Sequence, residues 1–409
     1  MDNTGPTPAP RLDGDFLAAL DRQLGAADEH LAAHYQGDPG GRQPVHTVYV
    51  PADRADVSAW GAQALALLDA VGPDALPADA EVSARVRAKL VSQPIEDLRI
   101  DFEDGYGVRP DPEEDAAAVA VGAELARLLA AAGGPSFGGI RFKSLEAATR
   151  RRGLRTLDLA IGSLLAAGPM PDGFVVTLPK VTSVDQVAAM VDVLVRLETA
   201  YGLDPGRLRF EIQVETPQAV LGADGRATVA PMVHAAGGRC VGLHYGTYDY
   251  SAGLGIAAAY QSMEHPAADH AKAVMQVAAA GTGVRVSDGS TNTIPTGPPE
   301  QVAAALALHA RLVCRSLERG FYQGWDLHPG HLVSRYVATY AFYRSGLPAA
   351  AERLRNYLGC TEGGVMDEPA TAQALASFLT RGLHCGALDD AETGFDRATL
   401  EALAARRTP

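Results

Sequence analysis

Short apolar runs recur along the chain, and longer segments with apolar residues at helical spacing separate them. The short runs predict β-strands at 46–52, 97–104, 139–144, 173–180, 209–216, 240–246, 284–290 and 324–329. The longer segments predict helices, for example at 53–72, 112–132, 182–201 and 299–319. This repeated order of strand and helix predicts an α/β protein with a parallel sheet.

Two architectures have this order of elements, a closed (β/α)8 TIM barrel and an open doubly wound sheet. Eight strands at similar spacing favour the closed barrel. No G-x-G-x-x-G motif follows the first strand, which argues against a dinucleotide-binding open sheet. We therefore predict a TIM barrel with a helical C-terminal extension.

The pattern divides the chain into three parts. Residues 1–43 are predicted to form an N-terminal arm, 44–345 the barrel and 346–409 the helical extension. The arm contains a predicted helix at 14–36, with Phe16 and Leu20 among the apolar residues on one face. Helices at 330–345, 348–358 and 369–382 are predicted to follow the last strand, with a marginal one at 396–406.

Composition narrows the class of protein. The net charge of −14 argues against nucleic acid as a partner, because a phosphate backbone needs a basic face. No apolar run reaches transmembrane length, and the polar, Pro-rich start does not resemble a signal peptide, so we expect a cytoplasmic protein without membrane association. The four cysteines form no C-x-x-C pair, which argues against a zinc or redox motif.

Two acidic residues follow neighbouring predicted strands. Glu215 ends the run FEIQVET, and Asp249 follows the run that begins at 240. In a parallel barrel both carboxylates would lie at the C-terminal end, where they repel each other unless a cation lies between them. Carboxylates without neighbouring His or Cys favour Mg²⁺ over zinc, with Mn²⁺ as an alternative.

Other charged residues are predicted at the same end of the barrel. Glu103 and Asp104 end the second strand, and we expect them to hold metal-bound water or to orient Arg141, unless they belong to an ordinary turn. Arg141 in the third strand is expected either to stabilise an enolate oxygen or to form a structural ion pair with the strand 2 acids. Lys180, after the fourth strand, is either a substrate contact or an anchor.

Seven motifs, taken in sequence order, resemble the HpcH/HpaI aldolase and citrate lyase β-subunit superfamily. They are RIDFEDGYGVRPDPEEDAA, GIRFKS, FVVTLPKVTSVDQV, FEIQVETPQAV, YDYSAGLG, GWDLHPGHL and GGVMDEPATAQAL. The last motif resembles the citramalyl-CoA and malyl-CoA lyase branch. Two features mark the chain as a divergent member, a first strand without the usual Pro-Gly and an insertion-like stretch at 257–283.

The resemblance implies roles for individual residues. Glu215 and Asp249 would ligate Mg²⁺, Arg141 would stabilise an enolate, and Asp367 would act as acid and base from across a subunit interface. Glu103 and Asp104 would support the metal waters and Arg141. The resemblance also implies a homo-oligomer, trimeric or hexameric, and a CoA thioester as one class of substrate.

These observations predict a Mg²⁺-dependent carbon–carbon lyase or aldolase. It would cleave or form a bond between a 2-oxo acid, such as pyruvate, glyoxylate or oxaloacetate, and a carbonyl or acyl-CoA unit. Two alternatives remain open at this stage: a phosphotransferase that handles phosphoenolpyruvate on the same barrel, and a barrel that binds oxo acids without catalysis.

Overall fold

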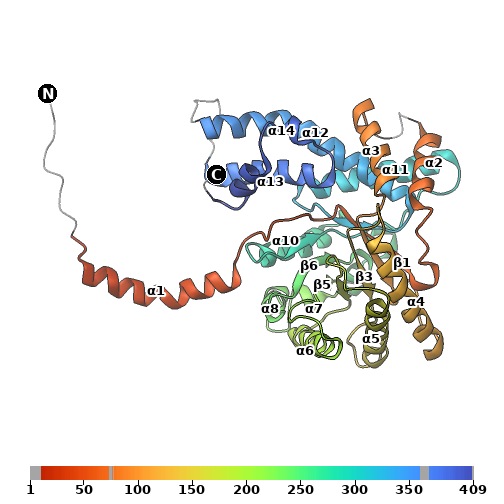
Figure 1. The fold of residues 1–409 in the computed structure, drawn as a ribbon, viewed down its shortest axis with the longest axis horizontal. Coiled ribbons are helices and arrows are strands. Elements are labelled where there is room, and N and C mark those ends of the chain that lie inside the picture. The colour runs from red at the N-terminus through yellow and green to blue at the C-terminus, as the bar shows by residue number, and fades with distance from the viewer. Residues whose placement is uncertain (1–10, 73–75, 77, 360–367, 408–409) are drawn as a thin grey trace.

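The computed structural model describes residues 11–72, 76, 78–359 and 368–407. Its strands are β1 His46–Pro51, β2 Asp97–Asp101, β3 Phe137–Arg141, β4 Val176–Leu178, β5 Phe210–Val214, β6 Cys240–Tyr245, β7 Arg285–Ser287 and β8 Gly324–Asp326. They form one parallel sheet in the order β7-β6-β5-β4-β3-β2-β1-β8 (Figure 1). Backbone hydrogen bonds from Asp288 to Gln323 and from Trp325 to Gly289 bring its two edges together. The prediction of a TIM barrel is confirmed.

The strands alternate sharply between two environments. Outward side chains such as Val48, Ile100 and Ile212 are buried against the surrounding helices and form the apolar core. Inward side chains include Arg99 and Glu211, which are buried and charged. The interior of this barrel is therefore polar. The positions of its charged side chains along the barrel axis determine which end can hold a reactive site.

Helices connect successive strands on the outside of the barrel (Figure 1). They are α2 Trp60–Val71, α3 Ala80–Ser92, α4 Asp111–Ala130, α5 Arg150–Ala167, α6 Val184–Tyr201, α7 Pro217–Val220, α8 Val229–Ala235, α9 Thr247–Gly253, α10 Pro266–Ala279 and α11 Pro299–Glu318, with 3-10 turns η1 Ala52–Arg54 and η3 Ala258–Tyr260. Among the described residues, every helix is too short or too polar to cross a membrane.

Two sequence interpretations need correction here. The helix predicted at 53–72 begins only at Trp60, because the Asp56 carboxylate accepts from the backbone N–H and hydroxyl of Ser58 at 2.9 and 2.6 Å and stabilises a turn instead. The stretch 257–283 is not an insertion, since it contains α10, the ordinary connection from β6 to β7.

The C-terminal helices are α12 Pro329–Gly359, α13 Pro369–Cys385, α14 Asp390–Thr393 and α15 Arg397–Ala404. The two helices predicted at 330–345 and 348–358 are one helix, which continues through Pro348. Proline removes one backbone hydrogen bond, but α12 packs against α2, α3, α11 and α13 along its length, and this packing maintains the helix. The division of the chain at 345 and 346 therefore falls within a helix, and the three-part division stays a prediction.

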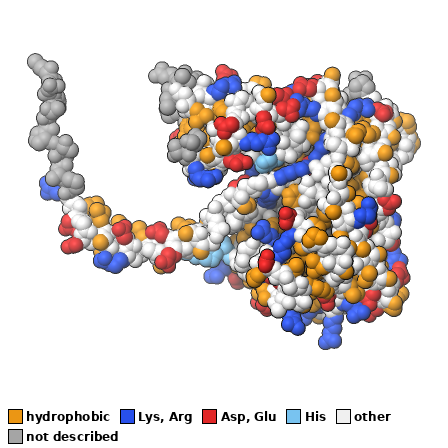
Figure 2. Space-filling model, in the orientation of Figure 1, with side chains coloured by type: hydrophobic (Ala, Val, Ile, Leu, Met, Phe, Trp, Pro, Cys, Tyr) orange, Lys and Arg blue, Asp and Glu red, His pale blue; other side chains and the backbone are white. Residues whose placement is uncertain are grey.

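The predicted N-terminal helix is present as α1 Gly14–His34, which begins where the Asp13 carboxylate accepts from the Phe16 N–H at 2.8 Å. It projects from the barrel, and none of its residues is buried (Figures 1 and 2). The following segment, residues 36–44, crosses the N-terminal end of the barrel. There Arg285 donates to the carbonyl oxygens of Gly40 and Gly41 at 2.7 and 3.0 Å.

Candidate active site

Charged side chains from four strand ends and one short helix meet at the C-terminal end of the barrel. They are Glu103, Asp104, Arg141, Lys180, Glu215 and Asp249. Parallel strands carry their C-terminal ends to one face, so residues that follow β2, β4, β5 and β6 converge although they are far apart in the sequence. The structure thus brings together every site residue predicted from the sequence except Asp367, which lies outside the described residues.

Lys180 connects the acidic residues. Its Nζ lies 2.8 Å from an oxygen of Asp104, 2.8 Å from an oxygen of Asp249 and 3.5 Å from an oxygen of Glu103. Its backbone N–H donates to Glu215 Oε1 at 2.7 Å. Its φ angle of 52° lies in the left-handed region, which costs about 1–2 kcal/mol for a residue with a side chain. One strained residue therefore contacts all four acids.

The acids are crowded enough to shift their proton affinities. Burial, with repulsion from Asp249, raises the pKa of Glu215 to about 7. Burial, with repulsion from Glu215 and Asp104, raises the pKa of Glu103 to about 8. At Asp104 burial acts in the same direction, but the hydrogen bond and charge of Lys180 outweigh it and lower the pKa. Carboxylates nevertheless outnumber the cations Lys180 and Arg141 at this end of the barrel.

Arg141 is held in a fixed orientation by Asp101. Its Nε and Nη2 each donate to one Asp101 oxygen at 2.7 Å, a two-point pair that fixes the guanidinium plane. Its Nη1 lies 3.4 Å from Glu103, and the guanidinium carbon is 5.1 Å from the centre of the Tyr49 ring. The ion pair with a strand 2 acid, one of the two predicted alternatives, is present, and Arg141 also contacts the acidic cluster.

Side-chain alternation along the second strand does not extend as far as the sequence indicated. In a strand that continued to 104, as predicted, Glu103 and Asp104 would point to opposite faces, but both contact Lys180. The reason is that β2 ends at Asp101, whose carboxylate accepts from the N–H groups of Glu103 and Gly105 at 2.9 Å each. These bonds form a turn that directs both later acids toward the site.

The donor set at this site suits a hard divalent cation. Glu215 and Asp249 offer carboxylate oxygens from two elements. Among the described residues, the buried Glu103 Oε2 makes no hydrogen bond, and it lies 3.4 Å from Arg141 Nη1. The Lys180 ammonium lies among these oxygens, where a bound metal cation would also be stabilised. Oxygen ligands in acidic excess are what Mg²⁺ binds in proteins. The residues therefore fit the metal that the sequence predicted.

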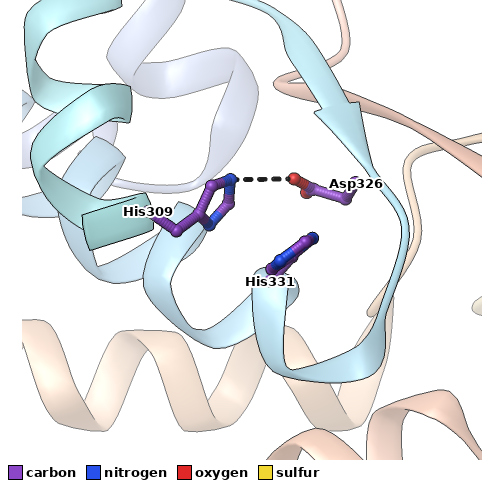
Figure 3. Close-up of side chains that lie close together, drawn as sticks. All are labelled: His309, Asp326 and His331. Carbon is purple, nitrogen blue, oxygen red and sulfur yellow. Dashed lines mark ion pairs between the residues drawn. The ribbon is translucent and has the colours of Figure 1, made fainter. Parts of the chain in front are cut away.

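A second group has the spacing of metal ligands and lies elsewhere. His309, Asp326 and His331 offer ligand atoms within 4.8 Å of one another (Figure 3). However, Arg335 already pairs with Asp326 at 2.7 Å. His331 uses both ring nitrogens, one toward the Thr293 carbonyl at 3.1 Å and one toward the Leu327 N–H at 3.3 Å. This buried cluster between β8 and the outer helices is structural, because no ligand position on His331 or Asp326 is free.

Sequence reasoning missed the part that Tyr49 and Asp101 play in the site. The sequence places Asp101 among the acids of the second strand and Tyr49 within the first strand, and it indicates no further role for either. The available signal was period-two alternation, which places Tyr49 on the inward face with Thr47. That signal gives the direction of a side chain but does not give its partner across the barrel.

Comparison with known proteins yields one family and several solved structures of similar fold. The family described as a domain of unknown function, DUF6986, matches residues 24–408. No curated protein matches the sequence.

A citrate lyase structure from Burkholderia xenovorans LB400 is similar with a TM-score of 0.58 and 20% identity, covering 87% of this chain and 96% of that one. A malate synthase structure from Haloferax volcanii, as its lead(II) complex, gives a TM-score of 0.51 and 16% identity over 88% and 90% of the two chains. Its magnesium/glyoxylate complex gives 0.50 and 17% over 89% and 97%. At these identities the likeness concerns the fold, and it agrees with the superfamily resemblance seen in the motifs.

Proposed function

This chain belongs to the DUF6986 family, and we propose that it is a Mg²⁺-dependent carbon–carbon lyase or synthase acting on a 2-oxo acid. The observation that carries the proposal is the excess of carboxylates around Lys180 at the C-terminal end of the barrel. In TIM-barrel enzymes that end holds the active site. Structures with the same fold are a citrate lyase and a malate synthase, and the latter includes a magnesium/glyoxylate complex.

Glu215 and Asp249 are the proposed metal ligands, with Mn²⁺ as an alternative ion. Bound there, the metal would supply Lewis-acid polarisation of the carbonyl of an oxo acid. Lys180 would have to withdraw its ammonium from Asp249 as the cation enters, while its backbone N–H could continue to hold Glu215. Glu103 and Asp104 would then be free to bind the waters around the ion.

Arg141 is the proposed stabiliser of negative charge on the reacting substrate. Its guanidinium carries a permanent charge, and its plane is fixed by Asp101 before any substrate arrives. Preorganisation of this kind costs no reorganisation at the moment when an enolate oxygen becomes charged. Asp367 stays the proposed acid and base, contributed from a second subunit of a trimer or hexamer, and a CoA thioester stays the proposed second substrate.

The test is release of a 2-oxo acid from malyl-CoA, citramalyl-CoA and citrate, measured with a coupled dehydrogenase. Turnover should require Mg²⁺ and disappear with EDTA. Glu215→Gln should lower it about 10³-fold or more, because the variant loses a metal ligand worth several kcal/mol in the transition state. Asp192→Asn, an exposed acid on α6, is the matched control and should leave turnover unchanged. Turnover that survives both EDTA and Glu215→Gln would overturn the metal mechanism.

A further inference from the structure

We propose that Tyr49 is a positioning residue for Arg141, because its ring attracts and holds the guanidinium at the place where negative charge develops on the substrate. The inference rests on the proposed function, which assigns the stabilisation of that charge to Arg141. It adds a residue that acts through Arg141 rather than on the substrate.

The Arg141 guanidinium is anchored along one edge. Nε and Nη2 each donate to Asp101 at 2.7 Å, and Nη1, which is not bonded to Asp101, lies 3.4 Å from Glu103 Oε2. Asp101 is fixed in turn, because its oxygens accept from the N–H groups of Glu103 and Gly105 at 2.9 Å each. This pair orients the guanidinium relative to one carboxylate, and the flat face of the group needs a separate support.

Tyr49 supplies that support from another strand. The guanidinium carbon of Arg141 lies over the Tyr49 ring, 5.1 Å from its centre, within the distance at which a cation is attracted to an aromatic face. The two residues are 7% and 6% exposed, so water screens this attraction little. On β3 itself, the preceding residue on the same face as Arg141 is Gly139, which has no side chain to offer. The ring on β1 therefore supports the guanidinium where β3 does not.

Tyr49 is itself held in place. Its hydroxyl donates to Glu211 Oε1 at 3.2 Å, and its ring centre lies 4.7 Å from that of Trp325. Burial, with the charge of Glu211, raises the pKa of Tyr49 well above its usual range, so the hydroxyl stays protonated and remains a donor. Glu211 in turn pairs with Arg99 at 3.1 Å. Tyr49 thus connects a buried ion pair inside the barrel to the arginine of the candidate active site.

Support of this kind affects the charged state of the substrate more than the uncharged carbonyl. An enolate oxygen needs a donor already in place when its charge develops, whereas a bound oxo acid makes a weaker demand on the same donor. Loss of the Tyr49 ring should therefore weaken binding of an enolate-like anion much more than binding of the oxo acid.

The test is isothermal titration of the full chain in Mg²⁺ with two probes. Oxalate is a planar dianion that resembles the enolate of a 2-oxo acid, and pyruvate is the oxo acid itself. Tyr49→Leu should weaken oxalate binding about 10-fold or more and pyruvate binding less than about 3-fold. Tyr49→Phe keeps the ring and should restore oxalate binding to within about 3-fold of the wild type.

Two further variants separate attraction by the ring from packing. Pentafluorophenylalanine at position 49 keeps a ring of similar size but reverses the charge distribution of its face, so it should bind oxalate at least about 3-fold more weakly than Tyr49→Phe. This comparison needs no loss of volume and applies even if Tyr49→Leu does not fold. Tyr340→Leu is the matched control, since it removes another buried tyrosine, whose hydroxyl donates to the Cys385 carbonyl at 2.7 Å on the C-terminal helices. It should leave oxalate binding unchanged.

A double mutant shows whether Tyr49 acts through Arg141. In an Arg141→Lys background, where the planar group is already lost, Tyr49→Leu should weaken oxalate binding less than about 3-fold further. A full additional loss there, equal weakening of oxalate and pyruvate, or equal oxalate binding by the fluorinated and Phe variants would overturn this inference alone. Absence of Mg²⁺-dependent oxalate binding in the wild type would overturn the proposed function together with it.

Discussion

Two clusters of charge lie inside one barrel and differ in balance and exposure. In the middle layer Arg99 pairs with Asp97 and Glu211, and all three side chains are at most 4% exposed. At the C-terminal end Lys180 faces Glu103, Asp104, Glu215 and Asp249, and the Asp104 and Asp249 side chains are 55% and 43% exposed. We call the first group, Arg99 with Asp97 and Glu211, the sealed cluster, and the group around Lys180 the open cluster. The sealed cluster maintains the barrel. The open cluster has more carboxylates than its own cations neutralise and can therefore bind an ion from solution.

The largest effect should come from breaking the sealed cluster. Arg99→Met leaves Asp97 and Glu211 buried without their cation, and unpaired buried charge of this kind costs about 3–5 kcal/mol. The free energy of unfolding, measured in urea at pH 7, should fall by that amount. Arg209→Met is the control two residues before Glu211 on β5, because its exposed side chain should cost less than about 0.5 kcal/mol. Equal losses in the two variants would show that the sealed cluster does not contribute as described.

The same cluster predicts a pH dependence with a definite sign. Burial, with repulsion from Glu211, raises the pKa of Asp97 from 3.8 to about 6 although Arg99 opposes it. The folded protein therefore holds this proton more tightly than the unfolded chain, and the stability it contributes is present below pH 3.8 and lost as pH rises through about 6. The loss is roughly 3 kcal/mol, at 1.36 kcal/mol per pKa unit.

Asp97→Asn isolates this contribution, because the amide does not titrate. The stability of the wild type relative to Asp97→Asn should decrease between pH 4 and pH 6 and then level off. Asp192→Asn, on the surface of α6, should show no such trend. A relative stability that rises with pH would mean that the Asp97 pKa is lowered in the folded protein.

The sequence predicted the parts of this comparison that depend on local pattern. The eight strands and the end at which Glu215, Asp249, Glu103 and Lys180 meet follow from strand periodicity and from the geometry of parallel strands. It failed at two helices, where tertiary packing or a local side-chain hydrogen bond overrides the helical pattern. Packing on four other helices maintains α12 through Pro348, and hydrogen bonds that Ser58 donates to the Asp56 carboxylate form a turn, so that α2 begins later than predicted.

A cavity of about 980 Å³ at the N-terminal end of the barrel could not be predicted for a related reason. An empty volume is defined by side chains that do not meet, and these come from strands that are distant in the sequence. Gly242 has the pattern of an ordinary strand residue, although a Cβ at this position would lie 3.1 Å from Nε2 of the His244 ring. Likewise the left-handed backbone at Lys180 has no signal in a run that reads as a strand.

A smaller effect should appear when the open cluster receives its ion. Mg²⁺ at 100 times its dissociation constant should stabilise the wild type by about 2.7 kcal/mol, and the gain should vanish in Glu215→Gln and Asp249→Asn. The measurement is the urea midpoint with Mg²⁺ and with EDTA. Arg99→Met tests the comparison itself, since it damages the sealed cluster and should keep the full response to Mg²⁺. If Arg99→Met lost the response to Mg²⁺ while Glu215→Gln and Asp249→Asn kept it, the ion would bind at the sealed cluster and not at the open one.

The smallest effect separates the charge of Lys180 from its backbone conformation. Lys180→Met and Lys180→Gly both remove the ammonium that competes with a cation for Asp249, so both should bind Mg²⁺ more tightly than the wild type. They differ at φ = 52°, which glycine adopts without the penalty that a side chain incurs. Part of that gain is offset because glycine leaves the unfolded chain more freedom, so Lys180→Gly should be more stable than Lys180→Met by about 1 kcal/mol or less. If Lys180→Met is the more stable of the two, the left-handed backbone is not a source of strain, and contacts of the side-chain stem hold this residue in place.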